Sequence, residues 1–395
     1  MSALVLPIQE QSLVNKTIEC SSTKEKVNLL IFRDLLRLGW NVDYPDNNNN
    51  EIKVSPPENY DKSTIRQSMG VKRQEIINNH KKWIDNHIHF AHNNLANGFD
   101  VLYSKIIPVI EVCQTRKQHD LFRILRLYWS SPYSEYVGRR IKLVIRDYGL
   151  PNKPVIGIAA LGSPVIHIPE RDNWIGWDKN TRTNNLNYTM DAYVIGALPP
   201  YNYLLGGKLI SYLLNSKEVR NIFEEKYKNT KYNKLAGIFT TSLYGRSSQY
   251  NRLRLRDRLL YNPIGETKGY GTLHLTNETF NAMNDYLKEN NILVSNKFGA
   301  GPSWRMRVIY SAGKLLGFDP DFLLHHSFKR KIYYVSLASN STDFLNGKTK
   351  HLKNYNSSVK TLKSYWHKRW LKQRLLNHKV LEDVKNFRNE DFYIE

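Results

Sequence analysis

Short runs of apolar, mostly β-branched residues bounded by Gly or Pro recur along the chain from about residue 100. In order, they include IKLVI, PVIGIAAL, PVIHI, DAYVIGAL, LAGIFTT and YGTLHL. Runs of this length and composition are typical of buried strands, and helical patterns alternate with the later ones. Because such strands bury their apolar faces under helices, we predict an α+β fold, with a mixed β-sheet core flanked by helices over residues 101–340.

The regions on either side of this core have different patterns. Residues 1–100 are predicted to be helical, because KEKVNLLIFRDLLRLGW spaces its apolar residues as a helix does. A second helical pattern, KRQEIINNHKKWIDNHIHFAHNNLANG, is expected to end at Gly98. An Asn-rich linker near residues 44–60 separates the two. Residues 341–395 form a third region, predicted to be a basic helical segment that contains aromatic residues.

Net charge is the strongest feature of the composition. The 395 residues include 58 Lys or Arg against 36 Asp or Glu, a formal net charge of +22. The charge is +5 over residues 1–150, +4 over 151–240, +6 over 241–330 and +7 over 331–395, so its density rises toward the C-terminus. Because neutralised phosphates release counterions, this excess favours a nucleic-acid partner, which we expect to be DNA. The alternative is a protein that is merely basic.

The C-terminal region concentrates this charge. Between Phe344 and Leu381 there are ten Lys or Arg and no acid, with Trp366 and Trp370 beside Lys368 and Arg369. Such a mixture suits phosphate contacts combined with base stacking. It also suits an amphipathic helix on an acidic membrane or partner. A third interpretation is a helix docked by its tryptophans, with a solvated basic face. A stripe of Leu362, Trp366 and Leu376 is compatible with all three.

A second basic segment, TSLYGRSSQYNRLRLRD, follows the predicted strand LAGIFTT directly. Loops that follow buried strands often carry function, so we expect a basic groove built from this segment, the WRMR helix and the C-terminal region. Its arginines would contact phosphates and its aromatic side chains would stack or pack. The predicted nucleic-acid-binding residues are Arg246, Tyr250, Arg252, Lys268, Arg305, Arg307, Trp366, Lys368, Arg369 and Trp370.

The competing interpretation is a nucleic-acid-processing enzyme with a polar pocket in the α/β core. The candidate catalytic residues are Asp172, Asp178, Ser247, Asn251 and Glu266. Two of them come from ERDNWIGWD, an acidic island in a basic chain, which we interpret more readily as an Arg171–carboxylate pair with packed tryptophans. Glu266 begins an E-x-K triplet, a spacing with very low specificity. No cofactor is assigned.

Other sites are tested and set aside. LLGGKLI lacks the Gly and Ser/Thr positions of a phosphate-binding P-loop, so Gly206 and Gly207 favour a tight turn or close helix packing over anion binding. Three histidines near residue 90 have poor geometry for a metal, and we predict no metal site. Because Cys20 and Cys113 are far apart and no membrane span or signal peptide is expected, we predict a cytoplasmic protein.

Several blocks between about residues 128 and 346 together resemble those of the Druantia anti-phage defence protein DruA family. They include WSSPYSEYVGRR, GIAALGSP, RDNWIGWD, GALPPYNYLLGGKLISYLLNSKEV, TTSLYGRSSQYNRL, PIGETKGYGTLHL, GPSWRMRVI and KRKIYYVSLASN, in the family's order. The resemblance implies a component of a multi-protein bacterial antiviral defence system, with partners that include a helicase-like subunit. It implies no known reaction. A non-catalytic adaptor that binds other system subunits therefore remains open.

Overall fold

The computed structural model describes two compact units that are interleaved along the chain. It covers Glu19, residues 22–43, 53–57, Tyr60, 62–131, 138–272, 274–296, 303–319 and 321–394. Cys20 and most of the predicted Asn-rich linker lie outside the described residues. The smaller unit comprises Met1–Asn78, Ser130–Pro132 and Thr267–Lys329, and the larger one Asn79–Trp129, Tyr133–Glu266 and Arg330–Glu395. The units thus draw on separate stretches of sequence, whereas the predicted division is linear.

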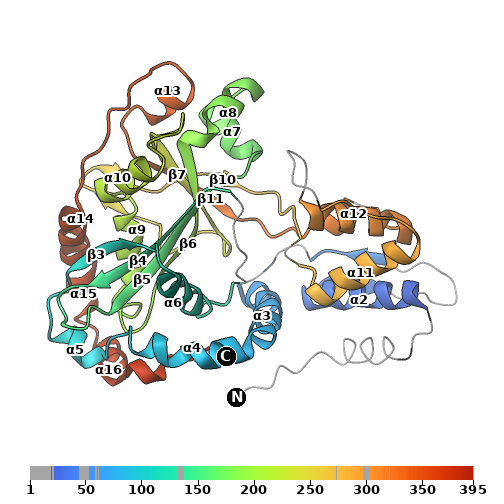
Figure 1. The fold of residues 1–395 in the computed structure, drawn as a ribbon, viewed down its shortest axis with the longest axis horizontal. Helices are drawn as coiled ribbons and strands as arrows, with labels where there is room; N and C mark the ends of the chain where they lie inside the picture. The colour runs from blue at the N-terminus through green and yellow to red at the C-terminus, as the bar shows by residue number, and fades with distance from the viewer. Residues whose placement is uncertain are drawn as a thin grey trace. The chain divides into compact units, whose positions relative to one another are not determined.

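A seven-stranded mixed sheet forms the centre of the larger unit (Figure 1). In spatial order its strands are β10 (Asn262–Glu266), β11 (Lys331–Ser336), β7 (Gly237–Ser242), β6 (Thr189–Ala197), β5 (Val155–Gly162), β4 (Arg140–Asp147) and β3 (Pro108–Val112). Only the β6–β7 pair is parallel among these neighbours. With helices on its faces, the unit has the predicted α+β architecture.

The parallel pair determines where the loops of interest emerge. β6 and β7 are paired only from Thr189 to Asp191, although β6 continues to Ala197 along β5. Because the two strands are parallel, the segments that follow them leave from the same edge of the sheet. One is the loop before helix α9 (Gly206–Leu213), and the other is the basic segment after LAGIFTT. The side-chain amide of Gln249, in that segment, donates to the Ile195 carbonyl of β6 (3.1 Å), so the two segments meet beside the sheet.

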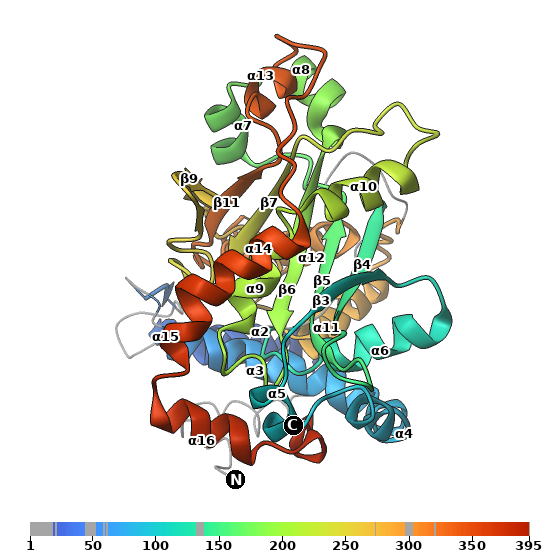
Figure 2. The same cartoon turned by 90° about the vertical axis from the view of Figure 1, so that its left-hand side faces the viewer.

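Helices cover both faces of this sheet, as Figure 2 shows for α9 and α14 on one of them. Tyr333 and Tyr334 are successive on β11, so their side chains point to opposite faces. Tyr333 belongs to the core that α9 and α14 complete, and Tyr334 to a second core with α7 and α13. The helices are α4 (Lys81–His92), α5 (Gly98–Leu102), α6 (Arg116–Arg126), α7 (Pro169–Ile175), α8 (Lys179–Asn185), α9 (Gly206–Leu213), α10 (Lys217–Lys226), α13 (Ser341–Leu345), α14 (Val359–Trp366), α15 (Lys372–Arg374) and α16 (His378–Asn386).

Some predicted elements are wrong. PVIHI forms no strand but leads into α7, with Val165 and Ile166 about half exposed and no neighbouring strand to cover them. The described residues of YGTLHL contribute only an isolated bridge from Tyr270 to His325. The end of the basic segment, whose LRLRD alternates as a half-exposed strand does, instead starts a tight hairpin of β8 (Arg254–Leu255) and β9 (Arg258–Leu259). These errors share a cause, because apolar composition cannot reveal whether a partner strand is present.

The smaller unit is mainly helical, with α2 (Thr23–Arg37), α3 (Lys62–Asn79), α11 (Asn277–Glu289) and α12 (Trp304–Leu316) and a hairpin of β1 (Asn41–Asp43) and β2 (Lys53–Ser55). Helix α11 packs on both α2 and α12. The predicted apolar stripe of α2 is confirmed, since Val27, Leu30, Ile31, Leu35 and Leu38 are buried. The second predicted helix is instead interrupted at His80, and Gly98 starts α5.

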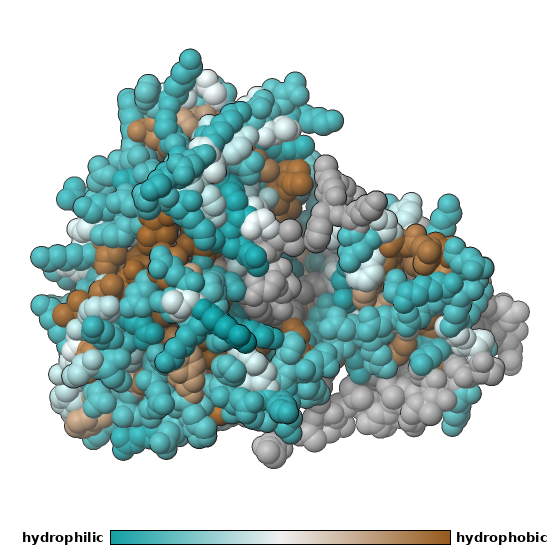
Figure 3. Space-filling model, viewed as in Figure 1, coloured by the Kyte–Doolittle hydropathy of each residue, from teal (hydrophilic) through white to brown (hydrophobic). Residues whose placement is uncertain are grey.

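In the residues that the structure describes, no helix is both long and apolar enough to span a bilayer. On the face drawn in Figure 3, the larger unit is mostly hydrophilic, with apolar side chains gathered on the side of β3 and α9.

Candidate nucleic-acid interface

The start of α9 is packed too closely to bind an anion on its glycines. A Cβ on Gly206 would lie 2.6 Å from the Tyr201 carbonyl oxygen, and one on Gly207 would lie 2.9 Å from the Gln249 side-chain oxygen. Leu205, just before them, adopts a left-handed conformation with φ of 59°. The prediction that these glycines serve a turn and close packing is therefore confirmed.

Lys208, which follows these glycines, connects α9 to the basic segment. Its ammonium donates to the carbonyl oxygens of Ser248 and Asn251. The side chain is almost fully buried, and it also lies over the Trp370 ring, 4.1 Å from the centroid. Three segments that are distant in sequence therefore converge on one ammonium group.

Two arginines act on the same group. Burial, which has the largest effect, and the positive charges of Arg252 and Arg369 together lower the pKa of Lys208 to about 8. The Arg369 guanidinium lies 5.4 Å from the centroid of the Trp370 ring. A cation whose pKa is lowered by other cations is in a field that no neighbouring carboxylate neutralises.

The two segments that meet at Lys208 carry exposed cations. Among the described residues, Arg246, Arg252, Lys368 and Arg369 are all exposed, and none of them forms an ion pair with a carboxylate. We call these four residues together with Lys208 the Lys208 surface. An uncompensated cluster of this kind concentrates anions, phosphates in particular.

Ser247 and Asn251 hold the basic segment in its conformation. The Ser247 amide donates to the Tyr333 hydroxyl (3.2 Å), and its own hydroxyl accepts from the Gln249 amide (3.1 Å). The Asn251 amide donates to the Ser247 carbonyl (3.0 Å), and Arg252 next to it has a positive φ of 61°. These two candidate catalytic residues thus have structural hydrogen bonds within one turn.

The aromatic residues predicted to stack on bases are used in packing. Tyr250 is buried and stacks on Tyr261 with a centroid distance of 4.9 Å and an interplanar angle of 4°. Trp366 is 1% exposed, and its indole donates to the Leu205 carbonyl (3.1 Å). The indole of Trp370 donates to the Tyr212 hydroxyl (3.2 Å), and Lys208 covers its ring. Tyr250 and Trp366 are therefore buried in packing, and Lys208 occupies one face of the Trp370 ring.

The C-terminal helix is docked by its apolar side, as in the third interpretation of its sequence. Leu362 and Trp366 are buried as predicted, but Leu376 is 72% exposed and the stripe continues through Leu371 instead. The reason is a π-helical turn over His367–Leu371, which adds one residue to the spacing and so shifts the buried face. The same turn leaves Lys368 and Arg369 on the solvent side.

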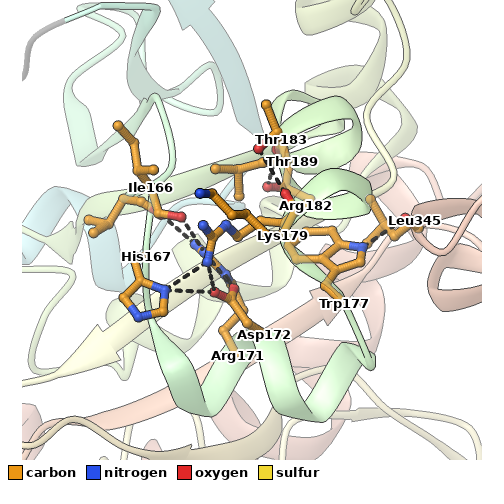
Figure 4. A network of polar contacts seen from close by, with 12 residues as sticks. Ile166, His167, Arg171, Asp172, Trp177, Lys179, Arg182, Thr183, Thr189 and Leu345 are labelled. Carbon is orange, nitrogen blue, oxygen red and sulfur yellow. Dashed lines mark hydrogen bonds and ion pairs between the residues drawn. The ribbon is translucent and has the colours of Figure 1, made fainter. Parts of the chain in front are cut away.

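ERDNWIGWD has the structural role that its sequence favours (Figure 4). The Arg171 side chain is fully buried and donates to one oxygen of Asp172 at 2.9 and 2.7 Å, while Arg182 donates to the other at 2.9 Å. Arg171 also donates to the Val165 carbonyl (2.6 Å), and the indole of Trp177 donates to the Leu345 carbonyl (2.7 Å). Asp172 is therefore committed to two arginines.

Asp178 and Glu266 also have structural contacts. Asp178 is the N-cap of α8, and the hydrogen bonds from the backbone and side chain of Thr181 lower the pKa of its carboxyl group. Glu266, at the end of β10, is about half exposed and pairs with Lys331 at 3.4 Å.

The five candidate catalytic residues do not converge on one pocket. The segment with Ser247 packs on the Tyr333 face of β11, whereas α7, which carries Asp172, packs on the Tyr334 face through Trp174. Two hollows of the larger unit, with volumes of about 650 and about 100 Å³, are lined by other residues. Ser247 and Asp172 therefore lie on opposite faces of β11.

Three predicted binding residues belong to the smaller unit. Arg305 donates to the Leu275 and Thr276 carbonyls (2.9 and 3.0 Å) at the start of α11, and burial lowers its pKa. Arg307 donates to the Ser295 carbonyl (2.6 Å), and Lys268 is exposed. Arg305 thus stabilises the local fold.

The binding residues predicted from the sequence did not include Lys208 or its neighbour Gln249. The Gly-Gly-Lys sequence signals a close approach, but nothing in it identifies the basic segment as the neighbour.

The fold and this surface define an α+β protein built on a mixed sheet, with a basic surface at the edge where two parallel strands end. A family model described as "Druantia protein DruA" matches residues 59–347. A curated relative described as Druantia protein DruA, from Escherichia coli (strain UMEA 4076-1), is 39% identical over 295 residues, which cover 72% of this chain and 72% of the relative. No solved structure matches the chain.

The chain therefore belongs to the DruA family. Its membership makes it a component of a Druantia anti-phage defence system, which contains several proteins.

Proposed function

We propose that this chain contacts nucleic acid, DNA in the first place, through the Lys208 surface. The observation that carries the proposal is the convergence of Lys208, Arg252 and Arg369 without a neutralising carboxylate. Buried or paired cations contribute to folding, but an uncompensated cluster costs stability unless an anion binds to it. A polyanion is the partner that this arrangement and the net charge of +22 favour.

The contact would be to the phosphate backbone and independent of sequence. Tyr250, Trp366 and Trp370 support this, because packing occupies their rings and leaves little for base stacking. Single-strand binders that stack bases need free aromatic faces. We therefore expect duplex DNA to bind at least as tightly as single strands of the same length.

A salt titration tests this function. The full chain is titrated with labelled duplex DNA, single-stranded DNA and RNA of equal length between about 50 and 200 mM salt. Affinity is expected to fall steeply, with a slope of about −0.9 for each phosphate contacted in the duplex. A flat titration on all three would exclude the proposal.

Two finer features belong to the same proposal. The chain would act beside a helicase-like partner and deliver DNA to it or hold DNA for it. It would work in the cytoplasm, where thiols stay reduced. Cys113, which is a free thiol, supports this location.

A further inference from the structure

A small hollow lies on the other flank of the C-terminal helix, between α14 and α5. Its volume is about 100 Å³. Apolar side chains line most of it, and they come from α5, the segment before β3, the turn before α9 and the C-terminal helices. The lining residues are Val101, Leu102, Ser104, Lys105, Ile106, Leu204, Lys363, His367, Leu371 and Leu375.

Apart from Ser104, the polar part of this lining is basic. Lys105, Lys363 and His367 contribute to it, and no acid does. Burial lowers the pKa of Lys363, Lys105 lowers it further, and Asp147 opposes them. Burial also lowers the pKa of His367, and the positive charges of Lys363 and Lys372 lower it further. Lys105 and Lys363 therefore repel each other, the lowered pKa of His367 favours its neutral form, and no acid lines the hollow.

Asp147 offsets part of this positive charge from inside the protein, but its carboxylate is not available at the surface. It is fully buried and accepts hydrogen bonds from the Tyr201 hydroxyl (2.9 Å) and the amides of Ile107 (2.7 Å) and Gly149 (2.9 Å). A carboxylate from outside the chain would meet lysines whose charge Asp147 offsets only in part.

Large apolar side chains lie next to the lining residues in the chain and remain exposed. Tyr103 and Ile107, on either side of Lys105, are 74% and 44% exposed, and Leu376, next to Leu375, is 72% exposed. In protein interfaces, an apolar hollow with exposed apolar and cationic neighbours is the kind of site that one side chain of the partner fills.

We propose that this hollow is a docking site for a protein partner that inserts one aliphatic side chain of about leucine size, flanked by acidic residues. Its volume is well below the roughly 300–1,000 Å³ of pockets for small organic ligands, and it suits a single side chain. A nucleic-acid backbone has no apolar group to fill it. None of the residues of the Lys208 surface lines the hollow.

The test measures fluorescence anisotropy of a labelled acidic peptide, Glu-Asp-Glu-Leu-Glu-Asp-Glu, with the full chain. Two matched peptides replace the central Leu by Ser or all acids by Gln. We expect the first peptide to bind. Replacing the leucine should weaken binding about tenfold or more, since a buried leucine contributes about 1.5–3 kcal/mol. Replacing the acids should also weaken binding about tenfold, because the lysines then lose their partners. Failure to bind at about 1 mM, or equal binding of the Leu and Ser peptides, would overturn the proposal.

Variants of the chain locate the site. Ser104→Phe should fill the hollow and Lys105→Glu should reverse a charge at its edge, and each is expected to weaken the peptide about tenfold. Lys379→Glu, an exposed change on α16, is the matched charge control and should have no effect. Lys105→Glu keeps the test valid if Ser104→Phe misfolds, because Lys105 is exposed. The duplex DNA affinity of Ser104→Phe should equal that of the wild type. Normal peptide binding by the Ser104→Phe and Lys105→Glu variants would contradict the assignment of the site.

Discussion

The α7–α8 helix pair and the Lys208 surface both combine arginines, polar residues and tryptophans. The positive charges are paired with a carboxylate in the first region and are not paired in the second. In α7–α8, Arg171 is fully buried and two arginines share the carboxylate of Asp172. On the Lys208 surface, Arg252 and Arg369 are exposed, and no carboxylate in the described part of the chain pairs with them.

This difference separates arginines that stabilise the fold from arginines that are available to a ligand. A buried pair is costly to break, because the remaining charge cannot be solvated. An uncompensated surface cluster costs little to mutate and loses its ligand instead. The two regions should therefore respond to mutation in different assays.

The largest expected effect is on the buried pair. Asp172→Ala leaves the Arg171 guanidinium buried without its carboxylate, so the free energy of unfolding should fall by about 3–5 kcal/mol. Urea denaturation followed by circular dichroism measures this loss. Duplex DNA affinity, measured at a temperature where the variant is folded, should match the wild type. A stable variant with weakened DNA binding would reverse the roles assigned to the two regions.

Lys208 gives the comparison a pH dependence. With its pKa lowered to about 8, Lys208 loses its proton between pH 7 and 9, and a bound phosphate favours the protonated form. Duplex affinity should therefore fall up to about tenfold as the pH rises through 8. The Lys208→Met variant should bind more weakly at pH 7 and lack this step. Parallel pH profiles for the two proteins would show that Lys208 does not respond to the ligand.

Asp178→Ala should destabilise the protein less than Asp172→Ala. The change removes the hydrogen bonds that cap α8, but the side chain is solvated and no buried charge is left behind. The thermal midpoint is expected to fall by a smaller amount than for Asp172→Ala, and DNA affinity should not change. A loss of DNA binding with an unchanged midpoint would give Asp178 a role in the interface.

The smallest effect is expected at Glu266. Its pair with Lys331 is solvent-accessible, so Glu266→Ala should change the free energy of unfolding by only about 0–1 kcal/mol. If the purified protein cleaves DNA with added Mg²⁺ or Mn²⁺, Glu266→Ala should leave the rate unchanged. Loss of metal-dependent cleavage in this variant would support the enzyme interpretation instead.

Local patterns in the sequence predicted the elements of both regions, but not which residues meet. The stripe of α2 and the strands IKLVI and DAYVIGAL are encoded by spacing and composition over a few residues, and they form as expected. The pairing of Arg171 with a carboxylate was also predicted, because the two residues are adjacent in sequence.

The convergence on Lys208 could not be predicted in the same way. Arg252 and Arg369 reach it from distant segments, and this depends on the order of β6 and β7 and on how the C-terminal helix docks. The orientation of Trp366 and Trp370 is likewise a tertiary property. A regular helical spacing predicted Leu376 in the buried stripe, but the π-helical turn places Leu371 there.

Charge reversal of the two uncompensated arginines tests the central claim most directly. The Arg252→Glu, Arg369→Glu double variant is compared with the Lys179→Glu, Lys379→Glu double variant, which changes the net charge equally at exposed positions away from Lys208. Duplex DNA affinity is measured for both over a range of salt. The account predicts that the first variant loses about 1.8 from the salt slope, for two phosphates, and that the second keeps the wild-type slope. Equal losses in both would mean that net charge alone, and not the Lys208 surface, holds the DNA.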